Sequence, residues 1–208
     1  MGKYHYNCET CPTRCDGKSK EQYLFENDSR LSEKYEQALI RHINRHNRYF
    51  AQKSTTSGYP DLELYHPNNP DTGAVTGFIE VKVQQRTFMS VRSSLPNGDL
   101  YASETVALNL SDLLRYFEVK NTTNLPLYIV WALLNRPCVL GKSNFRLFYQ
   151  EIDVLQVIYD KYLNKRRFRR KSGLGDIVDG EHKGVVVNYH FSLAELIPGL
   201  PFDLPEAG

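Results

Sequence analysis

Residues 57–84 read SGYPDLELYHPNNPDTGAVTGFIEVKVQ and combine two strand-like segments with a turn-rich insert. The segments 59–65 and 75–84 are rich in aromatic, aliphatic and β-branched residues, and HPNNPDTG between them is dense in turn formers, so the stretch predicts a β-hairpin. The second segment places Glu80 and Lys82 among apolar residues. One explanation is an amphipathic edge strand with a solvated Glu–Lys pair, and the other is a metal-dependent active site.

The predicted hairpin brings acidic and basic side chains together. Successive side chains of a strand point to opposite faces. Glu80, Lys82 and Gln84 therefore share one face, and the other face is apolar and predicts packing on a helix. Antiparallel pairing would bring Asp61 close to Glu80 and Lys82. Two neighbouring carboxylates raise each other's pKa, and a hard cation such as Mg²⁺ removes that penalty. Metal-activated water attacking phosphorus would then be a complete hydrolytic mechanism.

The composition predicts one ordinary folded domain. The chain has 208 residues, of which 41% are hydrophobic, and its net charge is +2 from 26 basic and 24 acidic side chains. This balance does not by itself indicate a nucleic-acid binder. No stretch approaches the ~20 apolar residues that span a bilayer, and the N-terminus has no apolar signal region. We therefore expect no membrane association and a cytoplasmic location.

The order of patterns along the chain predicts an α/β domain with a mixed central β-sheet flanked by helices. Beyond the hairpin, residues 85–104 look irregular or like a lid. Helical patterns cover 29–50, 110–120 and 152–163, and strand patterns cover 126–134, 144–150 and 184–191. We divide the chain into a Cys-rich N-terminal segment (1–27), the main domain with additional C-terminal elements (28–197) and a Pro-rich tail (198–208).

Pro60-Asp61 followed by Glu80-Val81-Lys82 resembles the motif of the PD-(D/E)xK phosphodiesterase superfamily. That group includes many restriction endonucleases, Holliday-junction resolvases and replication–repair nucleases. The surrounding order also resembles the family core, with a helix, two short strands, a helix and an apolar strand. The resemblance implies a restriction-endonuclease-like fold.

The resemblance also implies roles for individual residues. The candidate catalytic residues are Asp61, Glu80, Lys82, Glu36 and Gln84. Asp61 and Glu80 would bind Mg²⁺, for which Mn²⁺ can substitute, and Val81 would add its backbone carbonyl. Glu36 best matches a helix carboxylate that often joins such sites, and Gln84 resembles a polar residue that some members carry. The function implied is a Mg²⁺-dependent DNA endonuclease of the restriction type, acting as a homodimer.

Two other functions fit the same sequence. One is a structure-specific nuclease for repair or recombination, such as a junction resolvase. The other is a non-catalytic nucleic-acid-binding protein that is stapled by a metal and whose carboxylate–lysine pair is structural.

Cysteines near the N-terminus suggest a second metal. His5, Cys8, Cys11 and Cys15 read H-x2-C-x2-C-x3-C, a spacing typical of thiolate ligands for Zn²⁺ or an iron–sulfur cluster. Either His5 or Cys138 could supply a fourth ligand. Some nucleases similar to this chain carry a Cys-ligated iron–sulfur cluster, but their cysteines are split between distant ends of the domain, so zinc is preferred. The alternative is three unligated thiols on a tail.

A basic run follows the last predicted helix. It contains Lys165, Arg166, Arg167, Arg169, Arg170 and Lys171. Because it interrupts a folded region, we expect it on the surface, where it could contact DNA phosphates. A solvated loop far from the substrate is the alternative.

Overall fold

The chain folds into an α/β arrangement, and the computed structural model describes residues 3–8, 10–11, 15, 25–46, 48–68, 73–85, 87–169, 177–178, 181–182 and 187–201. Its α-helices are α1 (Phe25–Arg45), α2 (Val91–Ser94), α3 (Leu110–Thr123), α4 (Pro137–Leu140) and α5 (Ile152–Tyr162). Its strands are β1 (Phe50–Lys53), β2 (Leu62–Tyr65), β3 (Val75–Gln84), β4 (Thr105–Asn109), β5 (Leu127–Leu134), β6 (Phe145–Glu151), β7 (Arg167–Arg169), β8 (Ile177–Val178), β9 (Glu181–His182), β10 (Val187–Ser192) and β11 (Ile197–Pro198). Short 3₁₀ turns lie at η2 (Ala102–Glu104), η3 (Leu163–Arg166) and η4 (Leu193–Glu195).

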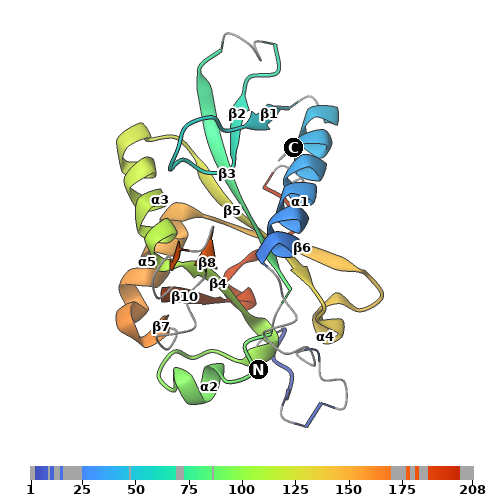
Figure 1. The fold of residues 1–208 in the computed structure, drawn as a ribbon, viewed down its shortest axis with the longest axis vertical. Coiled ribbons are helices and arrows are strands. Elements are labelled where there is room, and N and C mark those ends of the chain that lie inside the picture. The colour runs from blue at the N-terminus through green and yellow to red at the C-terminus, as the bar shows by residue number, and fades with distance from the viewer. Residues whose placement is uncertain are drawn as a thin grey trace, which may run out of the picture.

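A mixed six-stranded sheet forms the centre of the molecule, in the order β1-β2-β3-β5-β6-β11 (Figure 1). β3 and β5 run parallel, whereas β2 and β3 form the predicted antiparallel hairpin. Gly77 lets the start of β5 come close to β3, since a Cβ there would lie 3.1 Å from the carbonyl oxygen of Pro126. The predicted α/β fold, with a mixed central sheet flanked by helices, is confirmed.

One face of this sheet is covered by α1 (Figure 1). Leu39 and Ile43 on the helix pack against Ile79 and Val81 of β3 in one buried cluster. These two strand residues belong to the apolar face that the sequence predicted to lie under a helix. The polar side chains of β3 consequently face the other side of the sheet.

The opposite face is covered by α3, α5 and a second sheet of order β4-β10-β7 (Figure 1). Leu113 of α3 and Leu155 of α5 are fully buried in this cluster together with Trp131 of β5. The Trp131 ring lies 6.0 Å from that of Phe191 in β10, and its indole nitrogen donates to the carbonyl oxygen of Ala107 in β4. The second sheet therefore closes the core on the side where Glu80 lies.

The sequence prediction differs from the structure in several elements. The predicted second hairpin strand has the observed bounds of β3, whereas α1 begins at Phe25 rather than at residue 29. β1 and β4 were not predicted. β1 has only four residues and is positioned by Asn44, whose side-chain amide exchanges two hydrogen bonds with the backbone of Ala51. Residues 85–104, predicted to be irregular, contain α2 and η2.

The surface position predicted for the basic run is wrong for Arg166. Its side chain is 1% exposed, and Nη1 forms an ion pair with Oε2 of Glu195 at 2.6 Å. Nε donates to the carbonyl oxygen of Gly98 at 2.7 Å, and the guanidinium lies 3.5 Å from the centre of the Tyr162 ring. Lys165, Arg167 and Arg169 are exposed, and Arg170 and Lys171 lie outside the described residues.

Within the described residues, no helix combines the length and the apolar character that crossing a bilayer requires.

Replacing Arg166 with Ala should destabilise the protein by about 3 kcal/mol, because it breaks a buried ion pair. This value is near the lower end for such a pair, since the Glu195 side chain that remains is 20% exposed. Thermal unfolding should show the loss as a fall in Tm of roughly 2–4 °C per kcal/mol for a chain of this size. The matched control is Arg167→Ala, which removes an exposed arginine and should stay within about 0.5 kcal/mol of the unmodified protein. Equal Tm values for the two variants would contradict the structural role of Arg166.

Candidate active site

Asp61 and Glu80 lie opposite each other where β2 begins, and each side chain accepts a backbone hydrogen bond from the other's segment. The register pairs Leu62 with Ile79, so Asp61, one residue earlier, stands opposite Glu80. Oδ2 of Asp61 accepts a hydrogen bond from the backbone N–H of Val81 at 2.9 Å, and Oε2 of Glu80 accepts one from the backbone N–H of Asp61 at 3.2 Å. Each carboxylate is thus held by a backbone N–H of the other's segment, and the closeness of Asp61 to Glu80 is what the hairpin pattern predicted.

Lys82 lies between two carboxylates. Its ammonium forms an ion pair with Oε1 of Glu80 and lies 3.8 Å from Oδ2 of Asp112. Asp112 sits in the first turn of α3, and its Oδ1 accepts a hydrogen bond from Arg115 at 2.7 Å. Burial lowers the pKa of Lys82, but the charge and hydrogen bond of Glu80 outweigh burial and raise it above its usual value. In the metal-free protein Lys82 is therefore a charged hydrogen-bond donor.

Tyr116 also contacts Glu80. Its side chain is buried on α3, one turn beyond Asp112, and its hydroxyl hydrogen bonds to the Glu80 carboxylate. Burial and the negative charge of Glu80 raise the pKa of this phenol, so it stays protonated and donates. The sequence analysis missed Tyr116 and Asp112. The sequence held one indication of these two residues. They are four positions apart on the predicted 110–120 helix, which places both side chains on the same helix face.

Glu36 lies on α1, which covers the other side of the sheet. It is buried, and its Oε2 forms an ion pair with Nζ of Lys53 at 3.1 Å. The hydrogen bond and charge of Glu36 raise the pKa of Lys53, and the charge of Asp61 adds to this effect. Glu36 also acts on the pKa of Asp61. Glu36 therefore lies within electrostatic range of Asp61, although it is already paired with a lysine that the sequence analysis did not consider.

Gln84 lies farther along β3, and its amide oxygen accepts a hydrogen bond from the backbone N–H of Ala107 in β4 at 3.3 Å. This contact ties it to the second sheet. Val81 contributes the N–H that holds Asp61, and its side chain packs under α1.

The electrostatics of Asp61 suit a divalent cation. Burial and the nearby charge of Glu80 raise the pKa of Asp61 to about 7, against the lowering effects of the Val81 hydrogen bond and of Lys82. A hard cation bound to both carboxylates would offset this repulsion, and oxygen donors are the ligands that Mg²⁺ prefers. Asp61 and Glu80 would hold the ion. Among the described residues, no three His, Cys, Asp or Glu side chains already form a metal-binding group, so water and substrate oxygens would complete the coordination.

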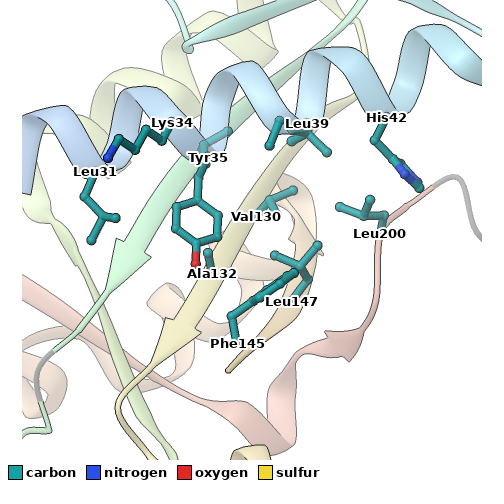
Figure 2. Close-up of a pocket in the computed structure, with 12 residues that line it drawn as sticks. Leu31, Lys34, Tyr35, Leu39, His42, Val130, Ala132, Phe145, Leu147 and Leu200 are labelled. Carbon is teal, nitrogen blue, oxygen red and sulfur yellow. The ribbon is translucent and has the colours of Figure 1, made fainter. Parts of the chain in front are cut away.

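A separate groove of about 650 Å³ lies on the opposite face of the sheet, between α1 and strands β3, β5 and β6 (Figure 2). Its lining is mainly apolar, and Tyr35 projects from α1 toward Ala132 while His42 projects toward Leu200. Val81 lines this groove, so the neighbouring side chains of Glu80 and Lys82 point away from it. The groove is therefore distinct from the carboxylate site.

The remaining predicted site residues lie elsewhere. Cys8, Cys11, Cys15 and Cys138 are thiols rather than members of disulfides, and all four are partly buried. The exposed members of the basic run lie in η3 and β7, beside the second sheet rather than in the hairpin that carries the carboxylates.

Comparison with known proteins gives a weak structural match. No family model matches the chain, and no curated protein matches its sequence significantly. One solved structure with a similar arrangement is that of Archaeoglobus fulgidus Hjc, described as a Holliday junction resolvase from an archaeal hyperthermophile. The match has a TM-score of 0.38 and 10% identity, and covers 79% of this chain and 85% of that chain.

In the metal-free protein, the contribution of Asp61 to stability should fall as the pH rises from about 4 to about 7. In this window folded Asp61 retains a proton that the unfolded chain releases, so the free energy of unfolding falls with pH until Asp61 is ionised. Asp61→Asn removes this effect and keeps an oxygen that can accept from Val81. In chelator, the Tm of Asp61→Asn relative to the unmodified protein should therefore be higher at pH 8 than at pH 5.

The same variant tests metal binding. At pH 8, Mg²⁺ or Mn²⁺ should raise the Tm of the unmodified protein, because a ligand that binds only the folded state stabilises it. The Tm of Asp61→Asn should rise only weakly when the metal is added.

In chelator, a Tm difference between Asp61→Asn and the unmodified protein that does not change with pH would contradict the raised pKa of Asp61.

Proposed function

We propose that this protein is a divalent-metal-dependent nuclease that hydrolyses phosphodiester bonds in DNA. The observation that carries the proposal is the contact set of Asp61, Glu80 and Lys82. Two carboxylates face each other across a hairpin, one of them has a pKa raised to about 7, and a charged lysine lies against the other. A solvated Glu–Lys pair on an edge strand does not fit, because β3 lies inside the sheet and Glu80 is 2% exposed.

Each residue of the site has its own proposed role in the reaction. Asp61 and Glu80 would hold the metal, which when bound would supply a Lewis acid and an activated water. Lys82 stays protonated, so it orients the attacking water or a phosphate oxygen by hydrogen bonding and offsets the charge that develops on the phosphate. Tyr116 positions Glu80 through its hydroxyl. Glu36 supports the site from α1 and is shared with Lys53.

The proposed active site fits two alternative forms of the reaction. Site-specific cleavage of duplex DNA is the form that the sequence predicted, with a homodimer that cuts both strands through two symmetry-related sites. Cleavage of branched DNA is the alternative form. Supercoiled plasmid, linear duplex and a synthetic four-way junction, each incubated with Mg²⁺ or Mn²⁺, separate these forms by product pattern. Size-exclusion chromatography with light scattering tests the dimer.

Asp61→Ala or Lys82→Ala should lower the cleavage rate at least ~10²-fold while DNA binding persists, since each removes a group that acts on the reacting phosphate. Because Lys82→Ala leaves a buried carboxylate without its cation, Lys82→Gln provides a second variant whose folding is less disturbed. Asp153→Ala is the matched control. It removes a carboxylate that is also paired with a lysine, Lys120, but lies half-exposed on α5.

A rate for Asp61→Ala equal to that of the control would mean that the site is misassigned. If the unmodified protein binds DNA but cleaves none of the three substrates with either metal, the protein is the non-catalytic binder instead.

The exposed arginines of β7 should strengthen binding to DNA without selecting a sequence. The double variant Arg167→Ala/Arg169→Ala should weaken binding to all sequences. It should also flatten the dependence of log K on log salt by roughly 0.9 per lost phosphate contact. Lys142→Ala, which removes an exposed lysine between α4 and β6, is the control and should leave the slope unchanged. An unchanged affinity and slope in the double variant would place the DNA-binding surface elsewhere.

A further inference from the structure

The N-terminal segment is docked on the body of the domain through Ser103 in η2. The Ser103 hydroxyl accepts a hydrogen bond from the backbone N–H of Tyr6 at 2.9 Å and donates one to the carbonyl oxygen of Tyr4 at 2.7 Å. The Tyr4 ring is buried and packs edge-on against Phe148 at 5.4 Å, and Arg146 lies 5.5 Å from its centre. Residues 3–8 are therefore part of the folded domain.

This docking gathers four thiols from two distant parts of the chain. Cys8 packs against the cluster that contains Val91 and Leu100, and Sγ of Cys15 lies 3.1 Å from the hydroxyl of Thr87. The thiols of Cys138, Cys15 and Cys11 all act electrostatically on Cys8, and those of Cys15 and Cys11 act on Cys138. Cys138, in α4, thus shares one neighbourhood with the three N-terminal cysteines.

A buried cation lies beside the thiols. Arg136 is fully buried two residues before Cys138, and its Nη1 donates to the carbonyl oxygens of Ser103 at 3.1 Å and Thr105 at 3.0 Å. Burial lowers the pKa of Arg136 to about 10, and the thiols of Cys15, Cys138 and Cys8 act in the opposite direction. Four thiolates around a divalent metal leave a net charge of −2, which an adjacent guanidinium would partly offset.

His5 is directed to another partner. Its ring lies against that of Tyr101, tilted by 35° and with the ring centres 3.4 Å apart. Of the two candidates for a fourth ligand, Cys138 is therefore the one that lies with Cys8, Cys11 and Cys15.

We propose that Cys8, Cys11, Cys15 and Cys138 form a structural zinc site that fastens the N-terminal segment to α4. The Cys-x2-Cys spacing fits the short chelate loops of closed tetrahedral zinc sites. The described side chains do not yet form a coordination group, so the ion would draw the four thiols into one sphere. The zinc proposal does not rest on the proposed nuclease function.

Elemental analysis of the full-length protein, purified under reducing conditions with zinc in the medium, tests the site directly. The expected result is about one zinc per chain. Co²⁺ exchanged into this site should give the visible absorption of a tetrahedral cobalt centre and the intense near-ultraviolet bands of thiolate ligation. Cys138→Ser should lower zinc affinity at least ~10-fold, because three thiolates form an incomplete structural site. His5→Ala is the matched control and should retain one zinc.

Circular dichroism of Cys138→Ser separates loss of a ligand from failure to fold. If that variant is unfolded, the cobalt spectrum of the unmodified protein still decides whether four thiolates bind the metal. Absence of zinc from the unmodified protein, or iron and sulfide in its place, overturns the proposal. So does full zinc retention in a folded Cys138→Ser variant, or loss of zinc in His5→Ala alone.

Discussion

The hydrogen bonds exchanged between Asp61 and the second hairpin strand fix the position of both carboxylates. Oδ2 of Asp61 accepts from Val81, and Glu80 accepts from the backbone N–H of Asp61. These contacts satisfy backbone donors at the point where β2 begins, so the same atoms hold the hairpin in register and hold two acidic groups together. Burial of Asp61 and its closeness to the charge of Glu80 have a cost, which appears as the raised pKa of Asp61. A slip of one residue would send Glu80 to the apolar face under α1, and register is therefore specified by the core as well as by the site.

Glu80 is the most completely satisfied member of this group. It accepts from the backbone of Asp61, from the hydroxyl of Tyr116 and from Lys82, which also lies near Asp112. A cation and two further donors offset much of the cost of burying a carboxylate inside a sheet. Asp61 has weaker compensation and titrates near neutral pH. This asymmetry makes Asp61 the carboxylate that would gain most from a bound cation.

The part of the site that lies in the hairpin could be predicted from the sequence, because period-2 alternation and a turn-rich insert are local signals. The bounds of β3 and the proximity of Asp61 to Glu80 followed from them. Asp112 and Tyr116 could not be placed, since their contact with Lys82 and Glu80 depends on how α3 packs on the sheet. For Arg166 the local sequence pattern led to the wrong prediction. In a run of basic residues its side chain looks solvated. Its burial is explained by the carbonyl oxygen of Gly98 and the carboxylate of Glu195, which come from distant segments of the chain.

The N-terminal segment and the carboxylate centre are connected through a short path. Ser103 and Arg136 fix η2 and the first residue of β4, and β4 is followed directly by α3. α3 carries the two side chains, Asp112 and Tyr116, that contact the Lys82–Glu80 pair. Only the five residues of β4 therefore lie between η2, on which the N-terminal segment is docked, and α3, which positions the charged groups of the site. Loosening the N-terminal segment would remove hydrogen bonds from η2, and its effect on the site would be transmitted by the placement of α3 rather than by any direct contact with the carboxylates.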